Sequence, residues 1–373
     1  MSVSSSNAGG RSRIAPLDGF RALAVVMVVA FHYLADLAMQ PEMTHLYPFG
    51  DAYVALPLVR FGNLGVQLFF IVSGFVIAMT LEVSRTPAEF ALKRFARLFP
   101  SMLLCTLLTF AALTWLPHPT WRVTAIDLLP GLTFVSEHVW SVWLDRPVSI
   151  VDGVYWTLFV EMKFYVLAAA LFFVVRKAPL LFSLGALLNL VFLITRLKFV
   201  GLPEGWIEIV KTSTVYDQLP LFVAGVAFYS LNARRHRFVA WWLLAESAVM
   251  LLMRLKFEAE PALFLGVFYL MFIGLVYAPQ TVAVFAWRPL VAIGASSYAL
   301  YLLHNRLGIS LTYNLGFAAP GWLRHSPVLP VGVGVAIALI SIAVHRVWEL
   351  PSRRVIVDRG LRIFGSRRSA VSS

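Results

Sequence analysis

Long runs of hydrophobic residues dominate the pattern of the chain. Most runs approach the ~20 residues that an α-helix needs to cross ~30 Å of hydrocarbon. They predict about ten membrane-spanning helices, at 17–38, 61–81, 98–116, 154–175, 179–199, 214–232, 237–253, 261–278, 289–313 and 327–347. The pattern therefore predicts an all-α integral membrane protein built as a helical bundle.

The stretch 126–142 is also apolar in places, but we do not expect it to span the membrane. It contains Pro130, Gly131 and Glu137. Irregular backbone at membrane depth is tolerated only where protein buries it or water reaches it. We expect this stretch to be interfacial or re-entrant.

Composition excludes an ordinary water-soluble domain. Hydrophobic residues make up 60% of the chain and charged residues only 13%, whereas soluble domains average about 45–50% and roughly a quarter. The single cysteine excludes a disulfide framework and a thiolate metal site. No spacing of histidine, aspartate and glutamate suggests a metal site.

The net charge of +12 is unevenly distributed among the segments that join the predicted spans. If the N-terminus is cytoplasmic, most of the 31 basic residues fall on the cytoplasmic side, as the positive-inside rule requires. We therefore expect both termini in the cytoplasm, with a disordered tail at 1–16, a membrane domain at 17–350 and a basic tail at 351–373. Anionic lipid headgroups are the expected partners of the basic segments. Nucleic acid is not, because no soluble domain is left to present them.

Several ionisable side chains lie inside predicted spans, where each costs about 2.5–3.5 kcal/mol to insert. They occur in the first span (Asp18, Arg21, His32 and Asp36), the fourth (Glu161 and Lys163) and the ninth (His304 and Arg306). So many polar groups indicate an internal site that water can reach.

The first span pairs a charged residue near its start with a histidine deep inside. Arg21 and His32 are separated by ~16 Å along a helix and by about three turns, so both can project to one side. A charged anchor and a neutral base in this arrangement suit a long substrate with an anionic head and a reactive tail, such as a coenzyme A thioester. A histidine that only hydrogen-bonds a backbone carbonyl explains His32 equally well.

Two arginines precede the third span. Arg94 and Arg97 face one way if this segment is helical, and guanidinium forks bind phosphates bidentately. Simple positive-inside anchoring is the alternative explanation.

Glu161 is predicted to lie at about the depth of His32, where a carboxylate can orient a histidine or accept a proton. Asp36, one turn after His32, is the alternative orienting group. Lys163 is a poor partner for Glu161, because residues two apart point to different sides of a helix. In the second span, the pair Ser73 and Gly74 is more typical of close helix contact than of a nucleophilic serine.

Several segments, in order along nearly the whole chain, resemble the acyltransferase 3 family of polytopic membrane O-acyltransferases. These enzymes modify bacterial cell-surface glycans and some secreted metabolites. The matching segments are "LDGFRALAVVMVVAFHY", "GVQLFFIVSGF", "KRFARLFP", "YWTLFVEMKFY", "SSYALYLLH" and "ELP". The chain departs from the family at Met102, where a tyrosine is common. We expect no fused extracytoplasmic SGNH-type hydrolase domain, which some members carry.

The resemblance implies an enzyme of the bacterial cytoplasmic (inner) membrane with no permanently bound cofactor. It would move a short acyl group, most often acetyl, from cytoplasmic acyl-CoA to a hydroxyl of an extracytoplasmic glycan or lipid-linked sugar. A transporter or flippase for a lipid-linked sugar or other solute is the competing interpretation, since many spans with buried ionisable residues fit one equally well.

The resemblance also assigns roles to the candidate residues. His32 would be the general base, and Glu161 or its rival Asp36 would fix the histidine tautomer or stabilise the imidazolium. The residues that would hold the coenzyme A phosphates are Arg21, Arg94 and Arg97. Tyr298 and His304 would line the acceptor site or stabilise the oxyanion.

Overall fold

The computed structural model describes residues 14–116, 118–175, 179–195 and 201–369. Every regular element in these ranges is a helix, which confirms the prediction of an all-α protein. Of the tail predicted at 1–16, residues 1–13 lie outside the described residues. Helix α1 (Ala15–Leu34) follows, with a proline in its first turn, where the missing N–H costs no hydrogen bond.

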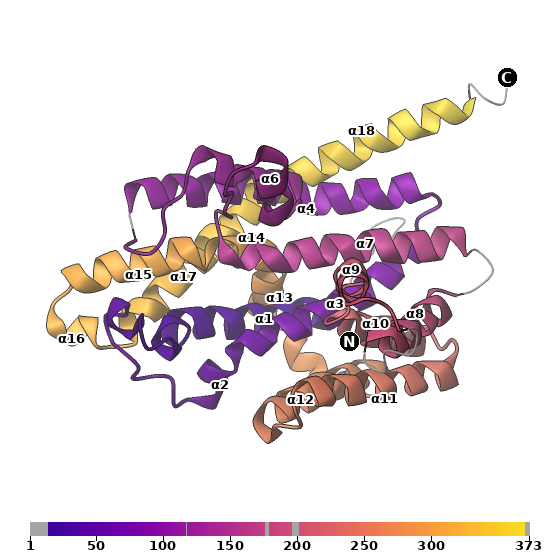
Figure 1. Ribbon diagram of the computed structural model, residues 1–373, viewed down its shortest axis with the longest axis horizontal. Coiled ribbons are helices and arrows are strands. Elements are labelled where there is room, and N and C mark those ends of the chain that lie inside the picture. Colours follow the sequence, from indigo (N-terminus) through magenta and orange to yellow (C-terminus); the bar gives the residue numbers. More distant parts are fainter. Residues whose placement is uncertain (1–13, 117, 176–178, 196–200, 370–373) are drawn as a thin grey trace.

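Six helical segments in the described part of the chain are long and apolar enough to cross a membrane. In Figure 1 the long helices run mostly along the long axis of the molecule. The six segments are α1, Gly62–Glu82 (containing α3, Gly65–Glu82), α4 (Pro87–Trp115), Gly153–Val174 (containing α7, Trp156–Val174), α12 (Ala259–Tyr277) and Val328–Arg362. They overlap predicted spans, and the chain has the helices of a polytopic membrane protein.

Three other predicted spans correspond to shorter or more polar helices. Helix α8 (Leu180–Thr195) has 16 residues and α10 (Leu219–Asn232) has 14, fewer than the ~20 needed to cross alone. Helix α11 (Arg237–Arg254) is longer but has an arginine at each end and Glu246 inside. The expectation of about ten spans therefore stays a prediction for these helices.

Helix α10 packs between α3 and α11, and nearly all its side chains are buried. Its backbone lies directly against that of α3, because Gly74 of α3 and Gly225 of α10 have no side chain to separate them. A Cβ added to either glycine would collide with the main chain of the other helix. The close helix contact predicted for the Ser73–Gly74 pair is thus confirmed at the glycine. Stacked rings of Phe228 and Phe272, with centroids 4.9 Å apart, extend this core towards α12.

The ninth predicted span, 289–313, is not one helix. It is divided into α13 (Arg288–Ala295), α14 (Ser297–Leu303) and α15 (Arg306–Ala318). The second break has a physical cause, because the buried carboxylate of Asp152 accepts the backbone N–H of Arg306, which a continuous helix would direct to its own carbonyl. The prediction of a continuous span was wrong here.

Near its C-terminus the chain stays helical well beyond the tenth predicted span. Helix α17 (Val328–Val344) continues through one π-helical turn (His345–Glu349) into α18 (Leu350–Ser369). Helix α18 packs against α4 and then projects from the bundle (Figure 1). The segment predicted as a basic tail from residue 351 is therefore helical throughout its described length.

The remaining helices are short. Within 126–142 the chain forms α5 (Leu128–Thr133) and α6 (Glu137–Leu144), separated by Phe134 in the left-handed region. This confirms that the stretch holds no long helix. The others are α2 (Pro57–Arg60), α9 (Glu204–Ser213) and α16 (Gly321–Arg324).

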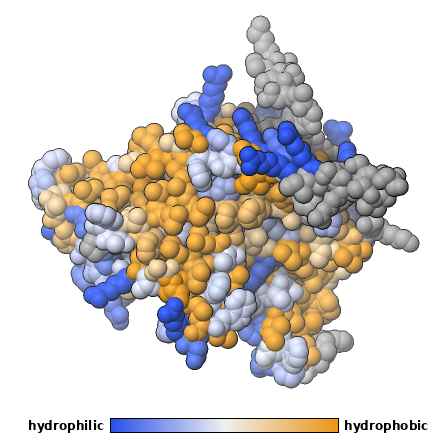
Figure 2. All heavy atoms as spheres, turned by 90° about the horizontal axis from the view of Figure 1, so that it is seen from above, coloured by the Kyte–Doolittle hydropathy of each residue, from blue (hydrophilic) through white to orange (hydrophobic). Residues whose placement is uncertain are grey.

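The face of the molecule seen in Figure 2 is hydrophobic over much of its area, and hydrophilic residues gather towards its edges. The exposed large apolar side chains come from several long helices, among them Val166, Leu270 and Leu339. A surface of this kind is suited to lipid rather than water.

Candidate active site

Three cavities follow one another through the bundle, and each shares lining residues with the next. The first, here called the basic cavity, has a volume of about 640 Å³. Its cationic lining residues come from α1, α4 and α18 and are Arg21, Lys93, Arg94, Arg97, Arg353 and Arg354. Carboxylates are fewer, with Asp18 and Asp358 in the lining. The basic cavity is therefore suited to a ligand with several negative charges.

The second cavity is a narrow passage of about 90 Å³ that continues from the basic cavity. The two share Arg21, Arg94 and Arg97. Further in, the passage is lined by polar side chains of α3, α7 and α14, which are Ser73, Thr157, Glu161, Tyr165, Ser297, Tyr298 and Tyr301. A slender polar chain fits such a passage, and a nucleotide does not.

The third cavity, here called the wide cavity, has a volume of about 460 Å³ and contains His32 and Asp36. It shares Val66, Phe70 and Tyr301 with the narrow passage. Its other polar lining residues are mostly amides, namely Asn63, Gln67, Gln218 and Asn305, with Arg254 nearby. The three cavities thus connect a cluster of cations to a histidine.

The predicted phosphate ligands do come together, but their electrostatic surroundings differ. Arg21 forms an ion pair of 3.1 Å with Asp18. Arg97 forms one of 3.0 Å with the fully buried Glu349. Arg94 donates to the Thr80 hydroxyl, and no described carboxylate forms an ion pair with it.

Glu349, which belongs to the "ELP" segment, has several polar contacts in the structure. Besides Arg97 it contacts Ser101 at 3.2 Å and His345 at 3.0 Å. The π-helical turn that ends at Glu349 carries these contacts, and such turns are frequent at functional sites.

Glu161 does not lie beside His32. Its carboxylate accepts hydrogen bonds from the hydroxyl of Ser73 and, at 2.6 Å, from that of Tyr165. Helix α7 directs it into the narrow passage with Arg21, whereas His32 lines the wide cavity. In the described part of the chain no hydrogen bond joins Glu161 to His32, so the prediction that Glu161 orients His32 is wrong. Lys163 points elsewhere, towards the carbonyl of Thr212.

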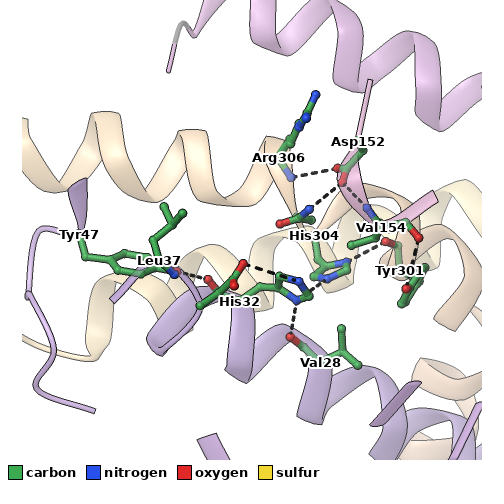
Figure 3. A network of polar contacts seen from close by, with 11 residues as sticks. Val28, His32, Leu37, Tyr47, Asp152, Val154, Tyr301, His304 and Arg306 are labelled. Carbon is green, nitrogen blue, oxygen red and sulfur yellow. Dashed lines mark hydrogen bonds and ion pairs between the residues drawn. The ribbon is translucent and has the colours of Figure 1, made fainter. Parts of the chain in front are cut away.

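His32 is held on both sides of its ring (Figure 3). Its Nδ1 lies 2.9 Å from the carbonyl oxygen of Val28 and 3.3 Å from Nε2 of His304. Its Nε2 lies 3.9 Å from a carboxylate oxygen of Asp36. Because a carbonyl only accepts hydrogen bonds, Nδ1 carries a proton, and Nε2 is the nitrogen left free to act as a base. Among the described residues, Asp36 is thus the carboxylate within ion-pair distance of His32.

His304 lines none of the three cavities. It is fully buried behind His32, and its Nδ1 lies 2.7 Å from the carbonyl oxygen of Tyr301. The expectation that His304 lines the acceptor site is therefore not met. Tyr298 does line the narrow passage, and its buried hydroxyl has no hydrogen-bond partner among the described residues.

Asp152 is a site residue that sequence reasoning missed. It is fully buried and accepts hydrogen bonds from Nδ2 of Asn305 at 2.8 Å and from the backbone N–H of Arg306 at 2.9 Å. The Arg306 guanidinium in turn donates to the carbonyls of Ile150 and Val151, at 2.6 and 3.0 Å. These contacts, here called the Asp152 clamp, fix the break that follows His304 (Figure 3). The only sequence signal was an acidic residue just before the fourth predicted span.

A family model and curated relatives match parts of this chain. A family model described as an acyltransferase domain matches residues 14–346. "Acyltransferase MdmB" of Streptomyces mycarofaciens is 29% identical over 177 residues, which cover 45% of this chain and 41% of that protein. An "O-acetyl transferase" of Shigella phage Sf6 is 32% identical over 99 residues, or 26% of each chain. The chain thus matches less than half the length of these relatives, and no solved structure matches it.

Proposed function

Because the chain belongs to the acyltransferase 3 family, we propose that it transfers a short acyl group from acyl-CoA to a hydroxyl of an extracytoplasmic glycan or lipid-linked sugar. Acetyl is the proposed group, since one relative is named an O-acetyl transferase. The observation that carries the proposal is the continuity of the three cavities, which lead from clustered arginines to His32.

Coenzyme A has the shape and charge that this route requires. Its nucleotide carries the phosphates and would occupy the basic cavity, where arginine forks bind phosphate oxygens bidentately. Its pantetheine arm is slender and would extend through the narrow passage. There the unpartnered Tyr298 hydroxyl is available to donate a hydrogen bond to a carbonyl of the arm. The thioester would then emerge next to His32.

We assign the strongest phosphate contact to Arg94. It lines the basic cavity and the narrow passage, and no described carboxylate neutralises it. Arg97 already has a buried ionic partner in Glu349, so it shapes the site more than it attracts new anions. Arg353 and Arg354 of α18 add positive charge to the cavity wall.

The chemistry assigned to His32 is general base catalysis. Nε2 takes the proton of the acceptor hydroxyl as that oxygen attacks the thioester carbonyl and a C–O bond forms. Asp36, on the Nε2 side of the ring, stabilises the imidazolium. When the tetrahedral intermediate collapses, the C–S bond breaks and the imidazolium returns the proton to the leaving thiolate.

The wide cavity suits an acceptor rich in hydroxyl groups. Its amide side chains can donate to and accept from hydroxyls, and the aromatic faces of Phe31 and Trp156 lie in the same wall. We place the basic cavity on the cytoplasmic side, where acyl-CoA is available and where basic residues accumulate by the positive-inside rule. Transfer would then cross the bacterial cytoplasmic membrane.

The direct test is transfer from labelled acetyl-CoA by the purified protein in lipid nanodiscs. We expect the wild type to release coenzyme A and to acetylate an added surface-glycan extract. His32→Ala should reduce this rate at least 100-fold, about the lower end of what general base catalysis contributes.

His45→Ala is the matched control, since His45 is exposed and lines none of the three cavities; it should retain the wild-type rate. A wild type that binds but never cleaves acetyl-CoA would favour the transporter interpretation.

A further inference from the structure

Two imidazole rings meet at the centre of the candidate site. His32 comes from α1 and His304 from the end of α14. Their centroids lie 5.0 Å apart, and the rings are inclined at 70° to each other. The contacting atoms are Nε2 of His304 and Nδ1 of His32, 3.3 Å apart (Figure 3). One of these two nitrogens must therefore carry a proton for the contact to be attractive.

The surrounding carbonyls decide which nitrogen carries it. Nδ1 of His304 lies 2.7 Å from the Tyr301 carbonyl oxygen and must be the donor there. His304 is fully buried, and no described carboxylate contacts it, so a charged ring would be costly. The neutral ring then has its lone pair on Nε2, which faces His32.

The proton of His32 lies on Nδ1 for the same reason. Its Nδ1 faces two acceptors, the Val28 carbonyl and the lone pair of His304. A proton on Nε2 of His32 instead would leave Nδ1 unprotonated. Its lone pair would then face the lone pairs of the Val28 carbonyl oxygen and of Nε2 of His304. The tautomer with a protonated Nδ1 is therefore fixed from two directions, and Nε2 is left unprotonated in the wide cavity, 3.9 Å from Asp36 and so beyond hydrogen-bond distance.

We propose that His304 is a positioning residue: its neutral Nε2 accepts the Nδ1–H of His32, holds the ring in the productive tautomer and shares the positive charge that forms when His32 takes a proton. The effect of this role on catalysis rests on the proposed function. It differs from lining the acceptor site, because His304 reaches none of the cavities. The contact strengthens in the charged state, since hydrogen bonds with an ionised donor are roughly twice as strong as neutral ones.

Two substitutions of His304 separate this role from simple packing. His304→Gln keeps an acceptor oxygen at about the reach of Nε2, whereas His304→Leu fills the space without one. We expect His304→Leu to lower kcat about tenfold or more, the loss expected for one hydrogen bond to a charged group, with KM for acetyl-CoA nearly unchanged. His304→Gln should remain within about threefold of the wild type in kcat, because its oxygen restores the hydrogen bond. Equal kcat values for the two variants would overturn the proposal.

A measurement on the resting protein tests the proposal even where activity is lost. In protein labelled with ¹⁵N-histidine and held at pH about 8, ordinary histidines are neutral, and NMR distinguishes protonated from bare ring nitrogens. Loss of signals in His32→Ala assigns His32, and loss in His304→Gln assigns His304. We expect a protonated Nδ1 and a bare Nε2 on both rings. A proton on Nε2 of either ring would overturn the proposal. Absence of acetyl transfer by the wild type, with the expected NMR pattern, would contradict the proposed function alone.

Discussion

Arg94 and Arg97 are one helical turn apart on α4, but they differ in how far their charge is already balanced. Arg97 is paired with buried Glu349, whereas Arg94 contacts the Thr80 hydroxyl and the rings of Phe90 and Tyr165 and forms no ion pair with a carboxylate in the described part of the chain. An incoming phosphate gains most from the guanidinium whose charge is not yet compensated. Arg94 and Arg97 are therefore expected to attract a phosphate to different degrees, although they belong to the same sequence segment.

Arg94→Ala is expected to raise KM for acetyl-CoA by about tenfold or more, since a hydrogen bond to a charged group contributes about 1.5–3 kcal/mol. The kcat value at saturating donor should change little, because the phosphates lie far from the reacting carbonyl. Steady-state kinetics with varied acetyl-CoA measures both quantities.

Arg359→Ala on the exposed part of α18 is the matched control, because Arg359 lines none of the three cavities. A change confined to KM for the acceptor would remove Arg94 from the donor site.

The roles assigned to the donor-side arginines and to His32 stay predictions. Sequence spacing did predict that these residues lie on regular helices, and Arg21, Arg94 and Arg97 line one cavity. Sequence spacing misplaced Glu161, whose orientation depends on Ser73 of α3 and on Tyr165. No pattern within the fourth span carries information about a hydroxyl from another helix. Hydrogen bonds between side chains of different helices therefore could not be predicted from the sequence.

At the level of elements, the break between α14 and α15 is the feature that shapes the candidate site around His304. A hydropathy profile depends on side chains only, so it predicts a single span for an apolar run such as 289–313. The break exists because the carboxylate of Asp152, distant in sequence, accepts the backbone N–H of Arg306 in place of a carbonyl of the same helix. It also accepts a hydrogen bond from the side chain of Asn305. Long uninterrupted helices such as α1 and α12 were predictable for the opposite reason, since their backbone groups bond within the segment.

Asp152→Asn should loosen the Asp152 clamp and displace His304 with it. The amide replaces one acceptor oxygen with a donor that faces other donors, and leaving a buried group unsatisfied costs about 1–3 kcal/mol. We expect a lower melting temperature and a kcat reduced about tenfold, by the same hydrogen-bond energy. Thermal unfolding followed by tryptophan fluorescence, together with steady-state kinetics, measures both effects.

Asp145→Asn is the matched control, because Asp145 is exposed and its left-handed backbone is one that asparagine tolerates. It should leave melting temperature and kcat unchanged. If Asp152→Asn behaves like Asp145→Asn, the clamp does not position the catalytic centre.

At the scale of the whole molecule, the three cavities follow one another in a fixed order through the bundle. The basic cavity lies between α1, α4 and α18, and the wide cavity lies beyond the narrow passage. Charge sorting along the sequence predicted which end faces the cytoplasm, and the sequence also suggested a separate C-terminal tail. The described part of that segment instead forms a wall of the basic cavity through Arg353 and Arg354. Composition alone could not predict that this polar segment forms a helix that packs against α4.

Sided membrane vesicles test the central claim, that acyl groups pass from a donor on one face to an acceptor on the other. Inside-out vesicles from cells producing the protein expose the cytoplasmic face, and labelled acetyl-CoA is added outside. We expect alkali-labile label on a luminal acceptor, protected from an added esterase until detergent opens the vesicles, and none with His32→Ala. Label that the esterase removes before detergent is added, or equal labelling by the two proteins, would contradict the central claim.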